Sequence, residues 1–283
     1  MNGLLIYQSI QTTYDQTRLQ TLIDAFAYRS IKVVTVATDQ VIRLLETTTP
    51  KFFKFAYFFE EDLQLAKALE SGYSLHVYNA ETPINIANDR ALLSISMRND
   101  GLPTPQTILL PYTMNQSILS QYQDVKSMLT SLPYPYLIKE RYVEDHQSVF
   151  FIRSESDLHA TFQQVGMKPL LAQEYIGLEA RKIIKVLVLG QSVRVAVEVV
   201  TKKDRLLLKQ IKPHRHVVKT AIQAVRAIGA DIALVHMLVI NQTIPYIYGI
   251  KTNPDLYELE SLTRYPLHDA LVQWIASSLK AAS

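Results

Sequence analysis

Charged side chains that follow apolar runs of the sequence are the first candidates for chemistry. Lys139 directly follows the apolar run 136–138, and an isolated ammonium group at the end of a strand suits an anionic ligand. The alternative is an ordinary exposed lysine. Asp255, Glu258 and Glu260 lie close together near the C-terminus, and carboxylate oxygens are ligands that magnesium prefers.

Two short segments, 202–205 and 209–216, are rich in Lys, Arg and His. Solvated faces and hairpin tips usually explain such clusters, and binding of an acidic partner or a substrate peptide is the alternative. His214 and His216 form an H-x-H pair, but a zinc site needs at least a third protein ligand. No third ligand is in view, so we do not expect zinc there.

The composition excludes several kinds of site. The 283 residues carry a net charge of +3, too small to indicate a nucleic-acid partner by itself. Cysteine is absent, which excludes disulfides, thiolate nucleophiles and cysteine-based metal sites. Only 8 residues are glycine, and the closest two are 11 positions apart. The glycine-rich phosphate loop, the dinucleotide-binding turn and the G-x-S-x-G nucleophile elbow are therefore excluded.

Strands and helices alternate over residues 1–80. Apolar and β-branched runs predict strands, and apolar spacings of three and four predict helices. The strands are expected at 4–7, 31–36, 52–59 and 76–78, and the helices at 18–28 and 60–71. We expect Gly72 to end the second helix. The alternation favours a small parallel α/β domain.

Antiparallel α+β units follow a junction near 81–105. Thr82 is expected to cap the next helix and Pro83 to begin it. Helices are predicted at 90–99, 114–131, 154–166, 216–228 and 267–280, and strands at 136–139, 149–152, 170–175, 183–189, 193–200, 233–240 and 244–250. The last four strands predict two hairpins. A junction between such units favours a ligand cleft.

The N-terminal run 1–7 lacks a basic segment and is too short for a signal peptide. No stretch approaches the roughly 18 apolar residues of a membrane-spanning helix. Together with the absence of cysteine, this favours a cytoplasmic protein without a membrane partner.

Several stretches carry a resemblance that their order and spacing make specific. They are 57–61, 79–84, 88–90, 101–105, 136–140, 173–176, 186–190, and 229–231 through 252–254. In this order they resemble the ATP-grasp superfamily, and most closely its RimK-like glutamate-ligase branch, which is similar to glutathione synthetase. The resemblance covers roughly residues 55–275.

The resemblance implies a fold and a reaction. The expected fold is ATP-grasp, with a small parallel α/β N-terminal domain at 1–85, a central subdomain at 86–170 and a C-terminal subdomain at 171–283. The last two would be antiparallel α+β units that hold ATP between them. The family's reaction activates a carboxylate as an acyl phosphate, which an amine then attacks.

The resemblance also implies an ATP site. Its residues would be Arg90, Lys139, Gln173, Glu174, Tyr175, Ile176 and Lys185. Lys139 and Arg90 occupy positions at which the family holds phosphates, and Arg keeps the charge with a different geometry. Residues 173–176 match the linker that meets the adenine edge, although an ordinary structural strand would explain them equally well.

The loop that should approach the phosphates departs from the family pattern. Relatives carry glycines after the Lys139 position, but here the segment 141–147 has Val143 and His146 instead. It also places Glu144 and Asp145 where phosphate should bind, and like charges repel. An Asp-Ile-Arg segment of relatives reads 183–185 here, with a charge kept only at Lys185.

The metal ligands depart most. The family's Asp, Glu and Asn ligands correspond to His236, Gly249 and Lys251. None offers the hard oxygen that magnesium needs. Asp255, Glu258 and Glu260 could rebuild a metal site. Alternatively, Lys251 and His236 could place a fixed cation where magnesium would sit, or Lys251 could pair with Glu258 or Glu260.

These departures lead to a hypothesis. We expect a pseudoenzyme with a residual nucleotide cleft that binds ATP or another phosphate-bearing small molecule, with doubtful use of Mg²⁺. It would act in binding or regulation, as a homo-oligomer or beside an intact ATP-grasp relative. The alternative is an active ATP-dependent carboxylate–amine ligase with relocated metal ligands. A nucleic-acid binder that uses the basic hairpin is the weaker third hypothesis.

Overall fold

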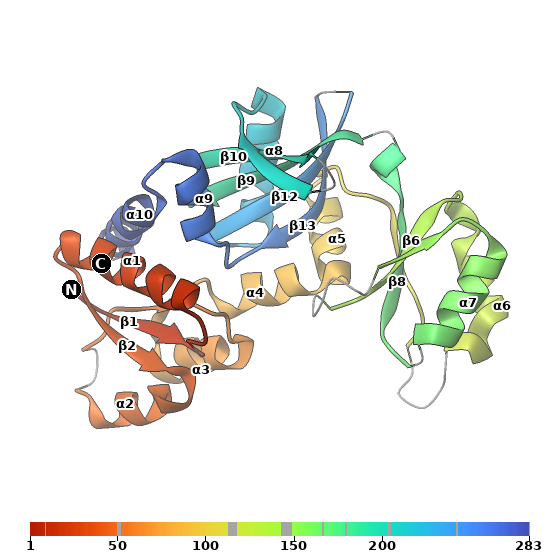
Figure 1. Cartoon of the computed structure of the whole chain (residues 1–283). Helices are drawn as coiled ribbons and strands as arrows, with labels where there is room; N and C mark the ends of the chain where they lie inside the picture. Colours follow the sequence, from red (N-terminus) through yellow and green to blue (C-terminus); the bar gives the residue numbers. More distant parts are fainter. Residues whose placement is uncertain are drawn as a thin grey trace.

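The computed structural model describes residues 1–8, 10–49, 52–112, 118–142, 149–165, 167–178, 180–202, 205–241 and 243–282. Three sheets organise these residues (Figure 1). A parallel N-terminal sheet is followed by an antiparallel central sheet and an antiparallel C-terminal sheet. This is the mixed α/β and α+β architecture that the sequence predicts.

The N-terminal sheet has the strand order β2-β1-β3-β4. Its elements are β1 (Asn2–Tyr7), α1 (Thr13–Tyr28), β2 (Lys32–Ala37), α2 (Val41–Thr47), β3 (Phe55–Phe58), α3 (Leu63–Tyr73) and β4 (His76–Tyr78). All four residues of β3 are buried, because separate apolar clusters cover the two faces of the sheet. α1 begins with a capping box between Thr12 and Asp15, which satisfies amides that its first turn leaves unpaired.

Several predicted helix boundaries were wrong. α1 begins at Thr13 and not at residue 18, and α3 begins at Leu63 and not at residue 60. α3 continues past Gly72 to Tyr73, and its C-cap is Ser74, whose φ of 51° is left-handed. Glycine costs a helix only about 1 kcal/mol relative to alanine, so one glycine near the end does not stop it. α4 (Glu81–Asn88) begins one residue before Thr82, so Ala80 occupies the cap position. Pro83 lies in the first turn, where the missing amide has no helical partner to lose.

The central sheet has the order β5-β8-β6-β7. It comprises β5 (Thr107–Leu109), β6 (Tyr136–Glu140), β7 (Val149–Ile152) and β8 (Leu170–Glu174), covered by α6 (Tyr122–Met128) and α7 (Glu155–Val165). The single helix predicted over 114–131 was wrong. From residue 118 onward, 3₁₀ turns at Ile118–Gln121 and Leu129–Ser131 flank α6, and residues 113–117 lie outside the described part. The tightened turns bring Ile118, Val125 and Leu129 into one core.

The C-terminal sheet has the order β11-β10-β9-β12-β13. It comprises β9 (Ala180–Leu189), β10 (Ser192–Lys202), β11 (Arg205–Gln210), β12 (Ile232–Ile240) and β13 (Ile244–Lys251). Both predicted hairpins form, β9 with β10 and β12 with β13. α8 (Arg215–Ala227) covers one face of this sheet. α9 (Leu256–Thr263) and α10 (Leu267–Ala282) follow β13.

The three sheets do not share their apolar cores equally. One apolar cluster joins the N-terminal sheet and α1 to the C-terminal sheet and α10. The central sheet and its helices enclose a core of their own. α4 and α5 (Arg90–Asn99) run beneath the C-terminal sheet and link the N-terminal sheet to the central one (Figure 1). Within the described residues, no helix combines the length and the apolar character needed to cross a membrane.

Asn79 fastens the end of β4 to the C-terminal sheet. Its side chain is 4% exposed. Nδ2 donates to the carbonyl oxygens of Ile232 and Thr252, each at 2.7 Å. Oδ1 accepts from the amides of Asp231 at 2.7 Å and Ile232 at 3.0 Å. The Asn79 side chain therefore uses all the hydrogen bonds that an amide commonly makes to join β4 to the C-terminal sheet.

Candidate functional site

Lys139 belongs to a chain of polar contacts across the central sheet. Its position on β6 is paired with Leu171 on β8. Nζ donates to Oε1 of Gln173 at 2.5 Å. Gln173 is buried, and its Nε2 donates to the hydroxyl of Thr107 on β5 at 3.0 Å. The sheet therefore fixes the amide orientation of Gln173, which in turn fixes the position of the lysine head group.

Arg90 lies close enough to disturb the charge of Lys139. Burial, together with the positive charge of Arg90, lowers the pKa of Lys139 to about 8. Burial also lowers the pKa of Arg90, whose Nη1 donates to the carbonyl oxygens of Glu140 at 2.5 Å and Tyr142 at 3.2 Å. In the described part of the chain, neither cation has a carboxylate within ion-pair distance. An anion placed beside both would relieve their repulsion.

A buried ion pair holds Arg90 against β6. Asp89 is 2% exposed, and its carboxylate accepts Nε of Arg141 at 2.8 Å and lies 2.7 Å from Nη2. The same carboxylate caps α5 by accepting the amides of Ala91 and Leu92. The backbone amide of Arg90 donates to the carbonyl of Arg141 at 3.0 Å. The junction of α4 and α5 is thereby tied to the strand that carries Lys139.

The predicted adenine linker follows directly from Gln173. Oε2 of Glu174 accepts the amide of Gln106 at 3.1 Å, so this carboxylate already has a backbone partner. The ring of Tyr175 meets Phe151 edge to face at 4.7 Å, and Ile176 is buried. These contacts explain why the segment has a fixed shape, and adenine recognition by it stays a prediction.

The second group of predicted residues forms a row across the C-terminal sheet. Lys185 on β9 is paired with His236 on β12, and His236 is paired with Gly249 on β13. Lys251 lies two residues beyond Gly249, opposite Leu234. Strand residues two apart share a face, so His236 and Leu234, and with them Gly249 and Lys251, lie on the same side. The resemblance assigns three of these positions to metal ligands.

The row is electrostatically unsuited to a divalent cation. Burial, together with the charges of Lys185 and Lys251, lowers the pKa of His236 to about 3. The imidazole is therefore neutral at pH 7, and its buried Nε2 has no hydrogen-bond partner among the described residues. A Cβ added at Gly249 would lie 3.7 Å from Nδ1 of His236, an ordinary contact. The backbone thus does not require glycine there, and these residues do not fit Mg²⁺.

Glu61 is a candidate that sequence reasoning missed. Burial raises its pKa, and the charge of nearby Lys251 opposes that rise. Its Oε1 and the hydroxyl of Thr252 are both buried, and the side chains of Thr252 and Asn88 also oppose the rise in its pKa. Glu61 follows β3 of a parallel sheet, and the carboxyl ends of parallel strands commonly carry ligand-binding residues. That position was the signal that could have identified it.

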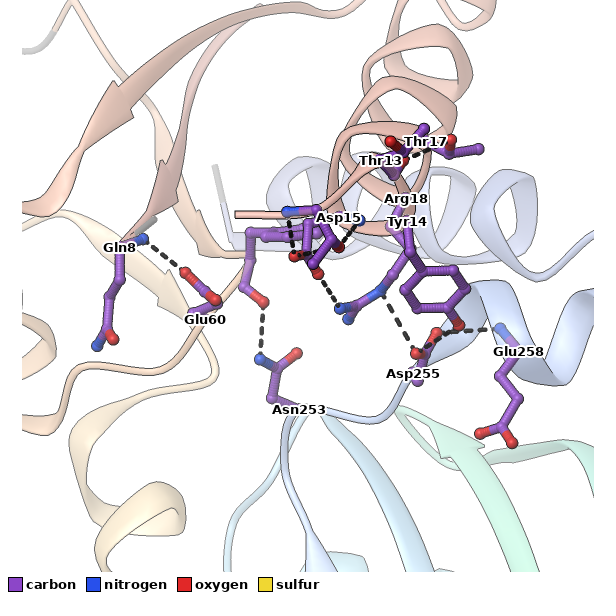
Figure 2. Close-up of polar contacts among 12 residues, drawn as sticks. Gln8, Thr13, Tyr14, Asp15, Thr17, Arg18, Glu60, Asn253, Asp255 and Glu258 are labelled. Carbon is purple, nitrogen blue, oxygen red and sulfur yellow. Dashed lines mark hydrogen bonds and ion pairs between the residues drawn. The ribbon is translucent and has the colours of Figure 1, made fainter. Parts of the chain in front are cut away.

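Asp255 is committed to holding helices together (Figure 2). Its carboxylate caps α9 by accepting the amide of Glu258 at 3.0 Å. It also accepts the hydroxyl of Tyr14 at 2.9 Å and lies 3.4 Å from Nε of Arg18. Glu260 accepts from His268 at 2.7 Å. No set of three or more His, Asp or Glu side chains in the described ranges is placed to hold a metal ion.

Other predicted features lie elsewhere. In the loop 141–147 only the first two residues are described, so Val143, Glu144, Asp145 and His146 lie outside the described part. The rings of His214 and His216 stack at 5.2 Å, and His214 caps α8. The side chains of 202–205 are likewise outside the described part.

Comparison with known families decides what this scaffold is. A family model of the RimK-like ATP-grasp domain matches residues 104–275, more than half of the chain. The chain belongs to the RimK-like ATP-grasp family. No curated protein matches its sequence.

Solved ATP-grasp structures share the whole fold. The D-alanine–D-alanine ligase of Bacillus anthracis has a TM-score of 0.75 at 15% identity, covering 100% of this chain and 98% of the ligase. The same ligase complexed with ATP gives 0.74 at 16%, with the same coverage. A RimK-domain ATP-grasp protein of Sphaerobacter thermophilus gives 0.74 at 17%, covering 97% and 99%. At these identities the likeness concerns the fold.

Proposed function

We propose that this RimK-like ATP-grasp protein binds a nucleotide, or another phosphate-bearing small molecule, between its central and C-terminal sheets without Mg²⁺. It would act in binding or regulation and would not catalyse ligation. The observation that carries this proposal is the row of Lys185, His236 and Lys251 at and beside positions that the family gives to metal ligands. Two ammonium groups flank a neutral imidazole there.

The cations of the central sheet support nucleotide binding. Lys139 and Arg90 are partly buried beside each other, and a unit charge pair at 4 Å is worth roughly 4 kcal/mol at an effective dielectric constant of 20. The ATP complex of the Bacillus anthracis ligase has the same fold. Lys139, Arg90, Lys185 and Lys251 would contact phosphate oxygens.

Fixed cations do not replace the metal in catalysis. A divalent ion bridges two phosphate oxygens and neutralises the charge that develops during phosphoryl transfer. Lysines on separate strands can attract the phosphates, but they do not provide one centre that coordinates both oxygens. Binding without turnover is therefore the function that this arrangement supports best.

The decisive experiment measures thermal stability with ATP in EDTA and with ATP in Mg²⁺. A ligand at 100 times its Kd stabilises the native state by about 2.7 kcal/mol. We expect ATP in EDTA to raise Tm and Mg²⁺ to weaken the effect, because Mg²⁺ reduces the charge that the lysines attract. A shift that requires Mg²⁺ would contradict the proposal.

Substitution of one lysine locates the site. Lys139→Met should abolish most of the ATP-induced rise in Tm. Lys126→Met is the matched control, because Lys126 also belongs to the central part of the chain but pairs with Glu155 at the surface. Equal losses in the two variants would show that the Lys139 position is not part of the site.

The pH dependence gives a second test. Because the pKa of free Lys139 is about 8, the ammonium is lost as pH rises through that value. We expect the Kd for metal-free ATP to increase about tenfold per pH unit above 8 in the wild type. Isothermal titration calorimetry of the wild type and of Lys139→Arg, whose charge persists, measures this directly.

Restoring the ligands tests the metal half of the proposal. The triple variant His236→Asp, Gly249→Glu and Lys251→Asn supplies the three oxygen ligands of the family pattern. It should make nucleotide binding Mg²⁺-dependent, whereas the wild type should remain independent of Mg²⁺. ADP release by the wild type that depends on an amino acid or a peptide would instead establish the alternative, an active carboxylate–amine ligase. Assembly with itself or with an intact relative also stays a prediction, for size-exclusion chromatography with light scattering.

A further inference from the structure

A cavity on the outer side of the C-terminal sheet is separate from the proposed nucleotide site. It has a volume of about 400 Å³. Its floor is apolar: Ile184, Val217 and Val239 belong to the core beneath α8 and are almost fully buried, and half-buried Ile211 and Pro213 complete it. Ile184 and Lys185 are neighbours on β9 and point to opposite faces of the sheet. The cavity therefore lies on the face opposite Lys185, beside α8, whose Val217 is part of its lining.

The rim of the cavity is basic. Lys182, Lys209, Lys212 and His214 line it, and all four side chains are exposed. Among the described residues of the lining, Glu198 is the one acidic side chain, 3.9 Å from Nζ of Lys182 and paired across the strands with Lys209. One carboxylate against three lysines leaves an excess of positive charge around an apolar floor.

The first turn of α8 adds positive charge where a helix disfavours it. It contains no acidic residue and begins with Arg215 and His216. The N-terminus of a helix carries a partial positive charge, so a cation there costs stability and an anion there gains it. His214 compensates only weakly, because its ring accepts the amide of His216 at 3.4 Å. Both the rim and the helix end therefore favour a negatively charged occupant.

We propose that this cavity docks an acidic peptide segment, with one apolar side chain on the floor and flanking carboxylates on Lys209, Lys212 and the start of α8. Charge complementarity identifies the occupant as anionic, and the apolar floor identifies it as a peptide. A single-stranded nucleic acid would use aromatic rings for base stacking, and the lining offers no Phe, Tyr or Trp among the described residues.

Fluorescence polarisation with labelled short peptides tests the proposal. One set has a single Leu, Ile or Phe flanked by Glu, and a second set has Gln in place of each Glu. The Glu peptides should bind at least about tenfold more tightly than the Gln peptides, with an affinity that falls as salt rises. Equal affinity of the two sets would overturn the proposal.

Charge reversal places the binding site. Lys209→Glu with Lys212→Glu should weaken binding of the Glu peptides at least about tenfold. The control is Lys32→Glu with Lys67→Glu, two exposed lysines of the N-terminal sheet and α3 that give the same change in net charge. Both variants should keep the wild-type response to ATP, and Lys209→Glu should lower Tm slightly because it faces Glu198 across the strands.

Two outcomes would refute the assignment. Equal binding by the two double variants would mean that the peptide binds elsewhere. Tighter binding of a single-stranded RNA oligonucleotide than of any Glu peptide, lost in the Lys209→Glu, Lys212→Glu variant, would establish a nucleic-acid site in its place. Because the cavity and the proposed nucleotide site lie on opposite faces of the sheet, either result leaves the nucleotide proposal standing.

Discussion

Glu61 destabilises the folded protein when it is ionised, because its carboxylate is buried. Burial raises the pKa of its carboxyl group, so the folded state binds its proton more tightly than the unfolded state does. The free energy of unfolding therefore falls as pH rises through this range. Glu61→Gln should raise stability at pH 8, because it removes a buried carboxylate that ionises at that pH. At pH 4 the two proteins should unfold at the same denaturant concentration, and a constant difference would contradict the assignment.

His236 gives the opposite pH dependence. Its pKa of about 3 in the folded state lies below the usual 6.5, so the unfolded state binds more protons between these values. Stability should fall as pH drops from about 6.5 to 3, by up to roughly 1.4 kcal/mol per unit. His236→Gln should remove this part of the acid sensitivity. Urea unfolding at pH 7 and pH 4 measures it, and unchanged acid sensitivity in the variant would show that another group titrates.

At the scale of elements, the Asp89–Arg141 pair joins a helix start to a strand end. Asp89→Ala removes the cap of α5 and leaves Arg141 without its partner. Loss of a cap costs about 1 kcal/mol. Loss of the charged hydrogen bonds adds about 1.5 kcal/mol, because the Arg141 side chain is 28% exposed and water can solvate it. Thermal or urea unfolding should therefore show a loss of roughly 2–3 kcal/mol.

The matched control is another aspartate cap. Asp62 caps α3 by accepting the amide of Leu65 at 2.9 Å, and it forms no ion pair with the described residues. Asp62→Ala should cost only about 1 kcal/mol. If the two alanine variants lose the same stability, the contribution of the Arg141 pair is negligible.

Most strands could be predicted from the sequence because their apolar runs are long enough to be recognised as strands. The two strands of the hairpin β9–β10 are ten and eleven residues long, and their pairing is interrupted only by a bulge between Val193 and Val195. β5, with three residues, and α2 and α9, with seven and eight, were missed because such short segments carry little periodicity. The prediction that α3 ends at Gly72 was wrong because a helix tolerates a glycine when its packed face continues on either side.

The candidate site was predictable only in part. Lys139 and Arg90 were separate predictions from a family pattern, and the repulsion between them depends on a burial that sequence does not reveal. Asp255 looked like a metal ligand because its partners, Tyr14 and Arg18, are more than 230 positions away in the sequence. Contacts of such separation follow from the packing of α1 against the C-terminal part, which no local pattern encodes.

At the scale of the whole molecule, the N-terminal sheet and the C-terminal sheet share one core. Asn79 is the polar counterpart of that core, with four hydrogen bonds to the C-terminal sheet and its following turn. Asn79→Ala should cost about 3–5 kcal/mol, because it also leaves buried backbone groups unpaired. Unfolding should remain a single transition for these two sheets.

Asn253→Ala provides the comparison. Its Nδ2 donates to the carbonyl of Phe59 at 2.8 Å, a single bond across the same interface. We expect a loss of about 1 kcal/mol. A loss for Asn79→Ala no larger than this would mean that solvent replaces its four bonds without cost.

The alignment of Lys185, His236 and Gly249 across three adjacent strands has a consequence for how such proteins diverge. Ladder bonds come from the main chain, so the identity of these side chains leaves the pairing intact. Reactivity can therefore be erased one substitution at a time while the framework persists. A protein that diverges in this way can keep the family fold after its catalytic residues have been replaced. Other surfaces of the same fold can then acquire a binding function.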